Sequence, residues 1–345
     1  MSRLIAIDLF CGCGGLTTGL KKAGFKVIGA VDIEPLAVET YKMNHRVEVV
    51  WQKNIKELSV EEVQSKLGLE PGDLDLLAGC PPCEGFSNLR THNGAKRVND
   101  LRNDLIFEFM RFVRGLSPKT IMLENVPKLM TDRRMAAVKK ELEALGYQFV
   151  VDVLDASNFG VPQRRKRMIL LGTRIGTVDF AQPVKRAKTV RDAIHALRKP
   201  KSKAGTGDDT LHVSNTNRSE RIKELIRSIP KNGGGRMDLG KKAQLPCHRR
   251  CDGFKDIYGR MSWDDVSPTI TGGCINPSKG RFLHPTQNRA ITLREAALLQ
   301  SFPSKYKFSL KKGSYAAASM IGDALPPDFI WRHAKQLVSV LGSDA

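Results

Sequence analysis

The first half of the chain alternates short apolar runs with stretches of helical periodicity. Residues 4–8 form a continuous run typical of a strand buried on both faces, and a glycine turn follows. Apolar positions then recur at helical spacing until Gly24, which stands where a helix C-cap is expected. Residues 25–31 predict the next strand, and Pro35 suits the first turn of the next helix.

The same alternation continues to residue 172 and ends in two strands with no helix between them. Repeated βα units that close with adjacent strands predict an α/β fold with an open, doubly wound, mostly parallel sheet. The further elements expected are strands at residues 74–78, 120–123, 150–154 and 168–172, and helices at residues 105–113 and 135–145.

The pattern breaks down after about Pro183. Residues 183–207 are rich in Lys, Arg and Ala, with one short amphipathic helix expected at residues 190–197. Residues 232–281 are rich in Gly, Pro, Asn, His and Arg and contain few long apolar runs. Helical character returns at residues 292–299 and 329–341.

A chain of 345 residues is long enough for a large domain and a small one. We expect residues 1–185 plus 313–345 to form the large domain. Residues 186–312 are then a smaller, loop-rich inserted domain together with a hinge.

Charge narrows the choice of partner. The 56 Lys and Arg against 36 Asp and Glu give a formal net charge of +20, which repels itself in the folded state and favours a polyanion. Nucleic acid is therefore the first expectation. A high positive charge can also serve only to keep a basic protein soluble. Charge alone therefore does not identify the partner.

Cysteine usage and hydropathy limit the class of protein. Seven cysteines, an odd number, indicate free thiols in a reducing, intracellular setting. Cys80 and Cys83, like Cys247 and Cys251, lack the second pair of a zinc ribbon, so we expect no metal. No segment resembles a signal peptide or a membrane span, and we expect a cytoplasmic protein without membrane contact.

The first turn has the features of a nucleotide-binding loop. Gly12 and Gly14 allow a tight turn and close approach of a ligand. Asp32 follows about twenty residues later at the end of a strand, where a carboxylate accepts ribose hydroxyls. NAD is the rival cofactor, but Thr17 occupies the third glycine position of its fingerprint.

A second stretch comes directly after an expected strand. Residues 79–87 read Gly-Cys-Pro-Pro-Cys-Glu-Gly-Phe-Ser, which places Cys83 at the sheet edge where open α/β folds bind ligands. With this stretch the chain resembles the DNA (cytosine-5)-methyltransferases of bacterial type. Motifs of that family recur in its order at residues 8–15, 81–83, 124–126, 163–167, 293–300 and 322–326.

The resemblance implies that the large domain is catalytic and binds the cofactor, and that the small domain reads the target. It also implies the chemistry. A methyl group passes from S-adenosylmethionine to carbon 5 of a cytosine while the Cys83 thiolate is bonded to carbon 6. Glu124 holds N3 and the exocyclic amine, which makes carbon 6 more electrophilic. Arg165 and Arg167 resemble the arginine pair close to the base, and Asn125 is expected to fix the loop geometry.

The resemblance also implies a set of cofactor contacts. Phe10 packs on the adenine, Asp32 binds the ribose and Ile33 lies beside the adenine ring. Asn54 stands where the family often has Asp, and Asp323 where it usually has Asn. The full set is Phe10, Gly12, Cys13, Gly14, Gly15, Asp32, Ile33, Asn54, Ile55, Pro81 and Asp323.

Contacts to DNA are expected from two regions. Residues 84–103 look like the family's mobile loop that closes over a flipped cytosine, although Glu84 replaces the usual Gln. Residues 269–273 are a candidate recognition loop in the small domain. The expected contacts are Ser87, Arg90, Arg97, Arg236, Arg260, Thr271 and Gly272.

Three other functions fit the sequence less well. A related tRNA methyltransferase is the main alternative, but its Cys-Phe-Thr tripeptide is absent and a long basic variable region is present. A DNA-binding protein with an inactive fold would lack Cys83 or Glu124, and a thioredoxin-like oxidoreductase leaves the other motifs unexplained. The expected partners are double-stranded DNA, to which a monomer binds in the nucleoid, and a companion restriction endonuclease of a restriction-modification system.

Overall fold

The computed structural model describes residues 3–82, 104–214, 217–240, 244–245 and 253–342. The chain divides into two compact units. The first comprises residues 1–159, 166–183 and 325–345, and the second comprises residues 160–165 and 184–324. Helix α10 (Gly313–Asp323) therefore packs with the second unit, whereas the sequence analysis placed it with the large domain.

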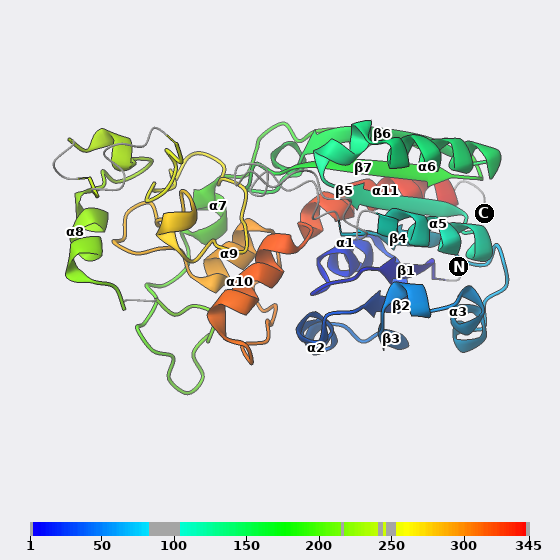
Figure 1. The fold of residues 1–345 in the computed structure, drawn as a ribbon, viewed down its shortest axis with the longest axis horizontal. Helices are drawn as coiled ribbons and strands as arrows, with labels where there is room; N and C mark the ends of the chain where they lie inside the picture. The colour runs from blue at the N-terminus through cyan, green and yellow to red at the C-terminus, as the bar shows by residue number, and fades with distance from the viewer. Residues whose placement is uncertain (1–2, 83–103, 215–216, 241–243, 246–252, 343–345) are drawn as a thin grey trace. The chain divides into compact units, whose positions relative to one another are not determined.

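A seven-stranded sheet in the order β3-β2-β1-β4-β5-β7-β6 organises the first unit (Figure 1). The first five strands run parallel, and β7 is antiparallel to both β5 and β6. The expected doubly wound, mostly parallel α/β sheet is confirmed. Its strands are β1 (Ile5–Leu9), β2 (Lys26–Asp32), β3 (Val49–Gln52), β4 (Leu76–Gly79), β5 (Thr120–Asn125), β6 (Gln148–Asp155) and β7 (Lys166–Thr173).

Helices cover both faces of the sheet. On one face α3 (Val60–Leu67), α5 (Leu105–Leu116) and α6 (Arg133–Ala144) bury their apolar stripes against side chains such as Ile7 and Leu77. On the other face lie α1 (Gly15–Ala23), α2 (Pro35–Asn44) and α11 (Pro327–Gly342). The axes of α1 and α11 come so close that a Cβ at Gly19 would lie 2.6 Å from that of Ile330.

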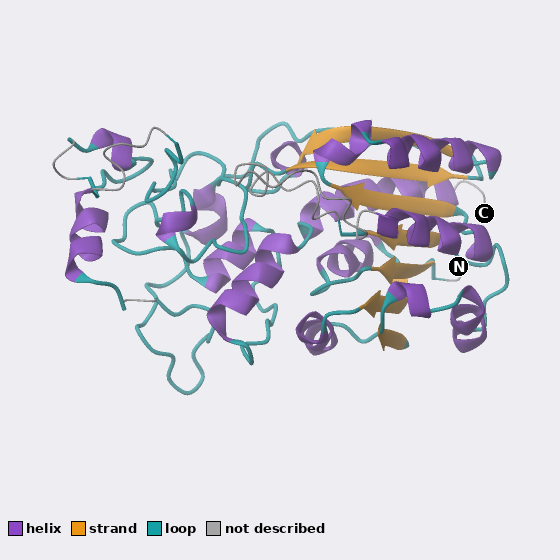
Figure 2. Cartoon of the chain, viewed as in Figure 1, coloured by secondary structure: helices purple, strands orange, loops and turns teal. Residues whose placement is uncertain are grey.

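Loops and short helices build the second unit, as Figure 2 shows. Its described helices are α7 (Val190–Ile194), α8 (Glu220–Ser228), α9 (Leu293–Leu299) and α10. Isolated bridges take the place of a sheet in its described part. Over the described ranges of both units, no helix is both long enough and apolar enough to cross a membrane.

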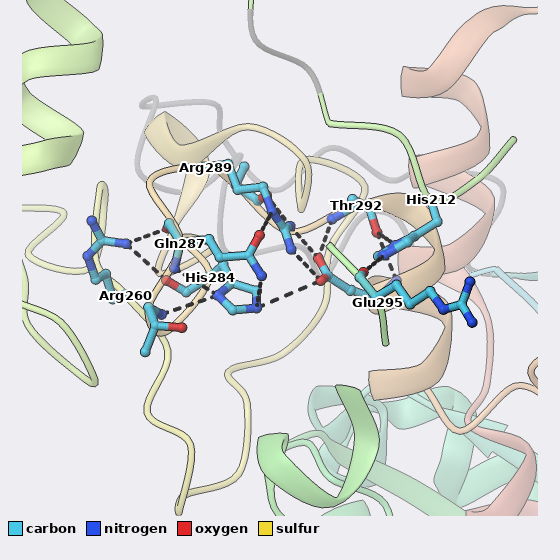
Figure 3. Close-up of polar contacts among 10 residues, drawn as sticks. His212, Arg260, His284, Gln287, Arg289, Thr292 and Glu295 are labelled. Carbon is cyan, nitrogen blue, oxygen red and sulfur yellow. Dashed lines mark hydrogen bonds and ion pairs between the residues drawn. The ribbon is translucent and has the colours of Figure 1, made fainter. Parts of the chain in front are cut away.

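A buried polar network holds α9 to the loops of this unit (Figure 3). Arg289 donates to both carboxylate oxygens of Glu295, each at 2.7 Å. Glu295 also closes a capping box with Thr292 at the start of α9. Burial would raise the pKa of Glu295, but Arg289 holds it below its usual value. Burial lowers the pKa of the neighbouring His284 to about 4, so that imidazole is neutral near pH 7.

Arg260 is the centre of a second part of this network. Its side chain is fully buried, and its guanidinium donates to the carbonyl oxygens of Ile226, Ile229, His284 and Gln287 and to Oδ1 of Asn288. All five of its N–H donors are therefore used inside the protein. The expectation that Arg260 contacts DNA is corrected: this arginine ties α8 to the loop before α9.

We expect Arg260→Met to destabilise the protein by about 3 kcal/mol or more, because four carbonyl oxygens would lose their donors in a buried site. The thermal unfolding midpoint should fall by about 6 °C or more. The control is Arg227→Met, since Arg227 is exposed on α8 and its loss should change the midpoint little. Equal midpoints for the two variants would contradict this role for Arg260.

Candidate functional site

Five segments of the first unit meet where its parallel strands end. The turn at residues 10–14 follows β1, Asp32 ends β2, and Asn54 follows β3. Pro81 follows β4, and Glu124 lies near the end of β5. The carboxyl edge of an open α/β sheet is where such folds bind their ligands.

Glu124 is a deeply buried carboxyl group at this edge. It is 1% exposed, and the thiol of Cys80 donates to its Oε2 over 2.7 Å. Nε of Arg167 lies 3.0 Å from its other oxygen, Oε1. Arg167 reaches it because β7 is antiparallel to β5, so that the start of β7 lies beside the end of β5. Three strands thus converge on one carboxylate.

Asn125 fixes the segment that leads to the expected nucleophile. Its Nδ2 donates to the carbonyl oxygen of Pro81 at 2.9 Å, and its Oδ1 accepts from the backbone of Val126. The side chain thereby joins the end of β5 to the segment after β4. The predicted role of Asn125 in loop geometry is confirmed.

The glycine turn at residues 10–14 is hydrogen-bonded to Asp32. Phe10, Gly12 and Gly14 have φ of 63°, 51° and 94°, a left-handed conformation that favours glycine at the latter two positions. Oδ2 of Asp32 accepts from the backbone N–H of Gly12, and Oδ1 from that of Glu34, both at 2.8 Å. Burial raises the pKa of Asp32, against the effect of these N–H donors. The carboxylate keeps further lone pairs for hydroxyl donors.

Asp8 is a buried acid at this site that the sequence analysis did not single out as functional. Its Oδ2 accepts from Oγ1 of Thr17 at 2.6 Å, and Thr17 in turn bonds the hydroxyl of Tyr41. Its Oδ1 is buried with no hydrogen-bond partner among the described residues. Burial raises the pKa of Asp8 to about 7, and the nearby Asp32 adds to the shift. Its place in an apolar strand gave no sign of a ligand.

The other expected cofactor residues differ in the exposure of their side chains. Ile33 is 64% exposed beside Asp32, which suits contact with a planar ring. Ile55 instead packs in the core at 4% exposure, so its side chain is not open to a ligand. Oδ1 of Asn54 caps the turn Ile55–Glu57 by accepting from the N–H of Lys56.

Three sequence motifs join inside the second unit. Nε2 of Gln163 donates to Oε1 of Gln300 at 2.7 Å, and Oε1 of Gln163 accepts from the N–H of Ile270 at 2.8 Å. Gln300 donates to the carbonyl oxygens of Ile321 and Ala324. The candidate recognition loop is therefore fixed to α9 and to the end of α10.

The remaining predicted site residues fall into three groups. Arg165 is buried in the second unit, where it donates to the carbonyl oxygen of Ile270. Arg236 is 1% exposed and donates to the carbonyl oxygen of Gly253, so we no longer propose it as a DNA contact. Thr271 and Asp323 are exposed. Cys83, Glu84, Ser87, Arg90 and Arg97 lie outside the described residues.

Comparison with known proteins assigns the chain to a family. The sequence profile described as C-5 cytosine-specific DNA methylase matches residues 4–339. The Type II methylase M.HgiDII of Herpetosiphon aurantiacus is 35% identical, with 93% of this chain and 91% of that protein covered. The Type II methyltransferase M1.HphI of Haemophilus parahaemolyticus is also 35% identical, with 94% and 84% covered. The chain belongs to the C-5 cytosine-specific DNA methylases.

The solved structures agree at the level of the fold. A prophage-encoded Escherichia coli protein, classed with DNA modification methyltransferases, superposes with a TM-score of 0.74 at 24% identity, over 98% of this chain and 99% of that one. The S. pombe Dnmt2 methyltransferase gives a TM-score of 0.61 at 17% identity, with 99% of both chains covered. The methyltransferase type of α/β fold is thereby confirmed.

The methylase site as described contains no metal centre. Among the residues that the structure describes, no three His, Cys, Asp or Glu side chains gather as metal ligands would. The described cysteines of this methylase, Cys11, Cys13, Cys80 and Cys274, are free thiols. Burial raises the pKa of Cys274 to about 12 and that of Cys11 well above its ordinary value, so both stay protonated.

We expect Asp8→Asn to flatten the pH dependence of stability. Between about pH 4 and pH 7 the folded chain keeps a proton on Asp8 that the unfolded chain has lost, so stability falls as pH rises through that window. A shift of about three pKa units corresponds to at most about 4 kcal/mol. Unfolding midpoints at about pH 5 and pH 8 should therefore differ less in the variant.

The control for this prediction is Asp179→Asn, because Asp179 is exposed. That variant should keep the pH dependence of the unchanged protein. If Asp8→Asn also keeps it, Asp8 does not hold a proton in the folded chain.

Proposed function

We propose that this chain methylates carbon 5 of cytosine in double-stranded DNA, with Cys83 as the nucleophile. The observation that carries the proposal is the buried Glu124 at the end of β5, next to an asparagine that fixes Pro81. Cys83 is two residues further along the chain from Pro81. Membership of the DNA methylase family supports the same assignment.

The reaction needs a nucleophile because carbon 5 of cytosine is unreactive in the aromatic ring. The thiolate of Cys83 forms a bond to carbon 6, which gives carbon 5 the electron density to take up a methyl group. Water then takes the proton from carbon 5, the electron pair of that C–H bond restores the ring double bond, and the sulfur–carbon bond breaks to regenerate the thiolate. A free thiol with a pKa near 8.5 is about a few per cent ionised at neutral pH, so nearby cations favour the reactive form.

Glu124 and the arginines act on the base in this proposal. Glu124 hydrogen-bonds N3 and the exocyclic amine, which withdraws electrons from carbon 6. Arg167, 3.0 Å from Glu124, orients that carboxyl group. Arg165 is proposed to lie near the same base. Cys80 donates to the second oxygen of Glu124 and so restricts its rotation.

The residues at the glycine turn fit S-adenosylmethionine. Asp32 has lone pairs for the ribose hydroxyls, the exposed Ile33 suits one face of an adenine, and the turn at Gly12 and Gly14 lets backbone approach the ligand. When bound, this cofactor supplies the methyl group on a sulfonium. Phe10, Cys13, Gly15, Asn54 and Asp323 remain proposed contacts.

DNA binding completes the proposal. Carbon 6 is shielded in the base stack, so the target cytosine must leave the helix, and residues 84–103 are proposed to close over it. Thr271 and Gly272, in a loop fixed by Gln163, are proposed to read the target sequence.

The Type II relatives favour a companion restriction endonuclease and a place on cellular DNA. We propose that the enzyme acts as a monomer.

The proposal is tested with purified protein and S-adenosylmethionine that carries a labelled methyl group. We expect label in a cytosine-containing duplex and far less in tRNA, and no transfer by Cys83→Ser. Label in tRNA alone would favour the related tRNA enzymes. Unimpaired methyl transfer by Cys83→Ser would contradict the proposed mechanism.

A fluorinated substrate tests the covalent bond directly. Fluorine at carbon 5 cannot leave as a proton does, so the sulfur–carbon bond should persist and the protein should migrate with the DNA on a denaturing gel. Cys83→Ser should not be retained. Release of the unchanged protein from a fluorinated site that it demonstrably methylates in normal DNA would refute the covalent step.

We expect Glu124→Gln to lower kcat by about 10² to 10⁴, the range for loss of general acid assistance. Glu143→Gln is the matched control, because Glu143 is exposed on α6. Single-turnover methyl transfer measures the effect on the chemical step. A Glu124→Gln enzyme as fast as the control would show that this carboxyl has no part in the reaction.

A further inference from the structure

Cationic side chains concentrate in one segment of the second unit. Eight of the 56 lysines and arginines fall within residues 185–203, here called the basic strip, which has a single acidic residue, Asp192. All eight are exposed. Like charges within a Debye length of about 10 Å repel one another, so a polyanion would stabilise this surface. None of these residues belongs to a motif used above.

Internal ion pairs do not neutralise the strip. Three of its cations have acidic partners, in the pairs Arg186–Asp192, Arg191–Asp264 and Lys201–Asp208. Within the described part of the chain, four others have no ion pair and extend into solvent: Lys185, Arg198, Lys199 and Lys203. An excess of positive charge therefore remains for an external partner.

The helical half of the strip is anchored to the second unit. Val190 and Ile194 of α7 are buried, and the backbone N–H groups of Val190 and Arg191 donate to the carbonyl oxygens of Asp265 and Trp263. The ring of His195 meets that of Trp263 edge-on, with 5.4 Å between centroids. Arg191, the cation of α7, thus projects from a backbone that is held in place.

The following half is also held by its backbone. His212 contacts the carbonyl oxygen of Arg198 at 2.7 Å, and the N–H of Ser214 donates to the carbonyl oxygen of Lys201. The other nitrogen of His212 contacts Thr292, which caps α9. Because the backbone is fixed and the side chains are exposed, a rigid polyanion can be bound with little ordering of the chain.

We propose that the basic strip binds phosphates of double-stranded DNA and is separate from the loop that reads the target sequence. The proposal rests on the proposed function in one respect, that duplex DNA is the substrate. Phosphate contacts by lysine and arginine add affinity without sequence preference and hold the protein on the duplex. The strip would thereby strengthen binding to DNA of any sequence.

The test is the salt dependence of binding to a fluorescein-labelled duplex of arbitrary sequence, followed by anisotropy. The variant carries Arg198→Gln, Lys199→Gln and Lys203→Gln, which leaves every ion pair of the strip intact. Loss of three phosphate contacts should reduce the slope of log affinity against log salt by about 2.7. From about 50 to 200 mM salt, the variant should then lose about 40-fold less affinity than the unchanged protein.

A matched control removes three exposed lysines from helices of the first unit. It carries Lys66→Gln, Lys140→Gln and Lys335→Gln, from α3, α6 and α11. This control should keep the slope of the unchanged protein. Equal slopes for the strip variant and the unchanged protein, or a change seen with tRNA and not with the duplex, would overturn the proposal.

Methyl transfer by the unchanged protein is measured in parallel and separates the two proposals. A reduced slope together with no transfer to DNA would leave the strip as a DNA-binding surface and reject the proposed reaction. Transfer to DNA with an unchanged slope would reject the strip and leave the reaction standing.

Discussion

The enclosure of Glu124 is the constraint on which the first unit depends. A carboxyl group that is 1% exposed cannot rely on water, so its partners must come from the protein. They come from the two strands that flank β5 in the sheet: Cys80 directly follows β4, and Arg167 lies at the start of β7. The reversed direction of β7 is what brings the arginine to this edge. A parallel strand in that place would put its first residues at the opposite edge of the sheet.

The second unit meets a different problem, since its described part has isolated bridges in place of a sheet. Its backbone groups find partners in side chains: Arg260 alone satisfies four carbonyl oxygens, and the Arg289–Glu295 pair holds the start of α9. A buried charge that lost its partners would be costly, so such a network favours one arrangement of the loops. This explains how a loop-rich unit can keep a fixed conformation.

Hydrophobic periodicity was enough to predict most of the sheet and its central helices, because the residues of β1, β2, β4, β5 and β7 are mostly buried. It missed β3 and α3. Strand β3 lies at the edge of the sheet with three residues partly buried and one exposed, and α3 is two turns long, so neither carries a clear pattern. Helix α10 was missed as well, since the sequence GSYAAASMIGD has little amphipathic contrast.

Motifs located most of the candidate site but could not separate surface arginines from buried ones. Arg236 and Arg260 stand in a basic, loop-rich stretch that resembles a DNA-binding surface, yet both are buried. Their donors reach carbonyl oxygens many residues away, such as that of Ile226 for Arg260, and no local pattern encodes such contacts. Cys80 was noted only for its spacing to Cys83, because its contact with Glu124 spans 44 positions.

The order of the family motifs has a spatial explanation in the second unit. The Gln163 motif bonds both Ile270 of the candidate recognition loop and Gln300 of the α9 motif. Gln300 in turn donates to the carbonyl oxygens on either side of Gly322, those of Ile321 and Ala324. Gly322 itself must lack a side chain, since a Cβ there would lie 2.2 Å from the carbonyl carbon of Thr271. Three motifs, the first more than a hundred residues before the other two, therefore act as one support for a single loop. Their joint presence reflects this packing as well as any contact with ligand.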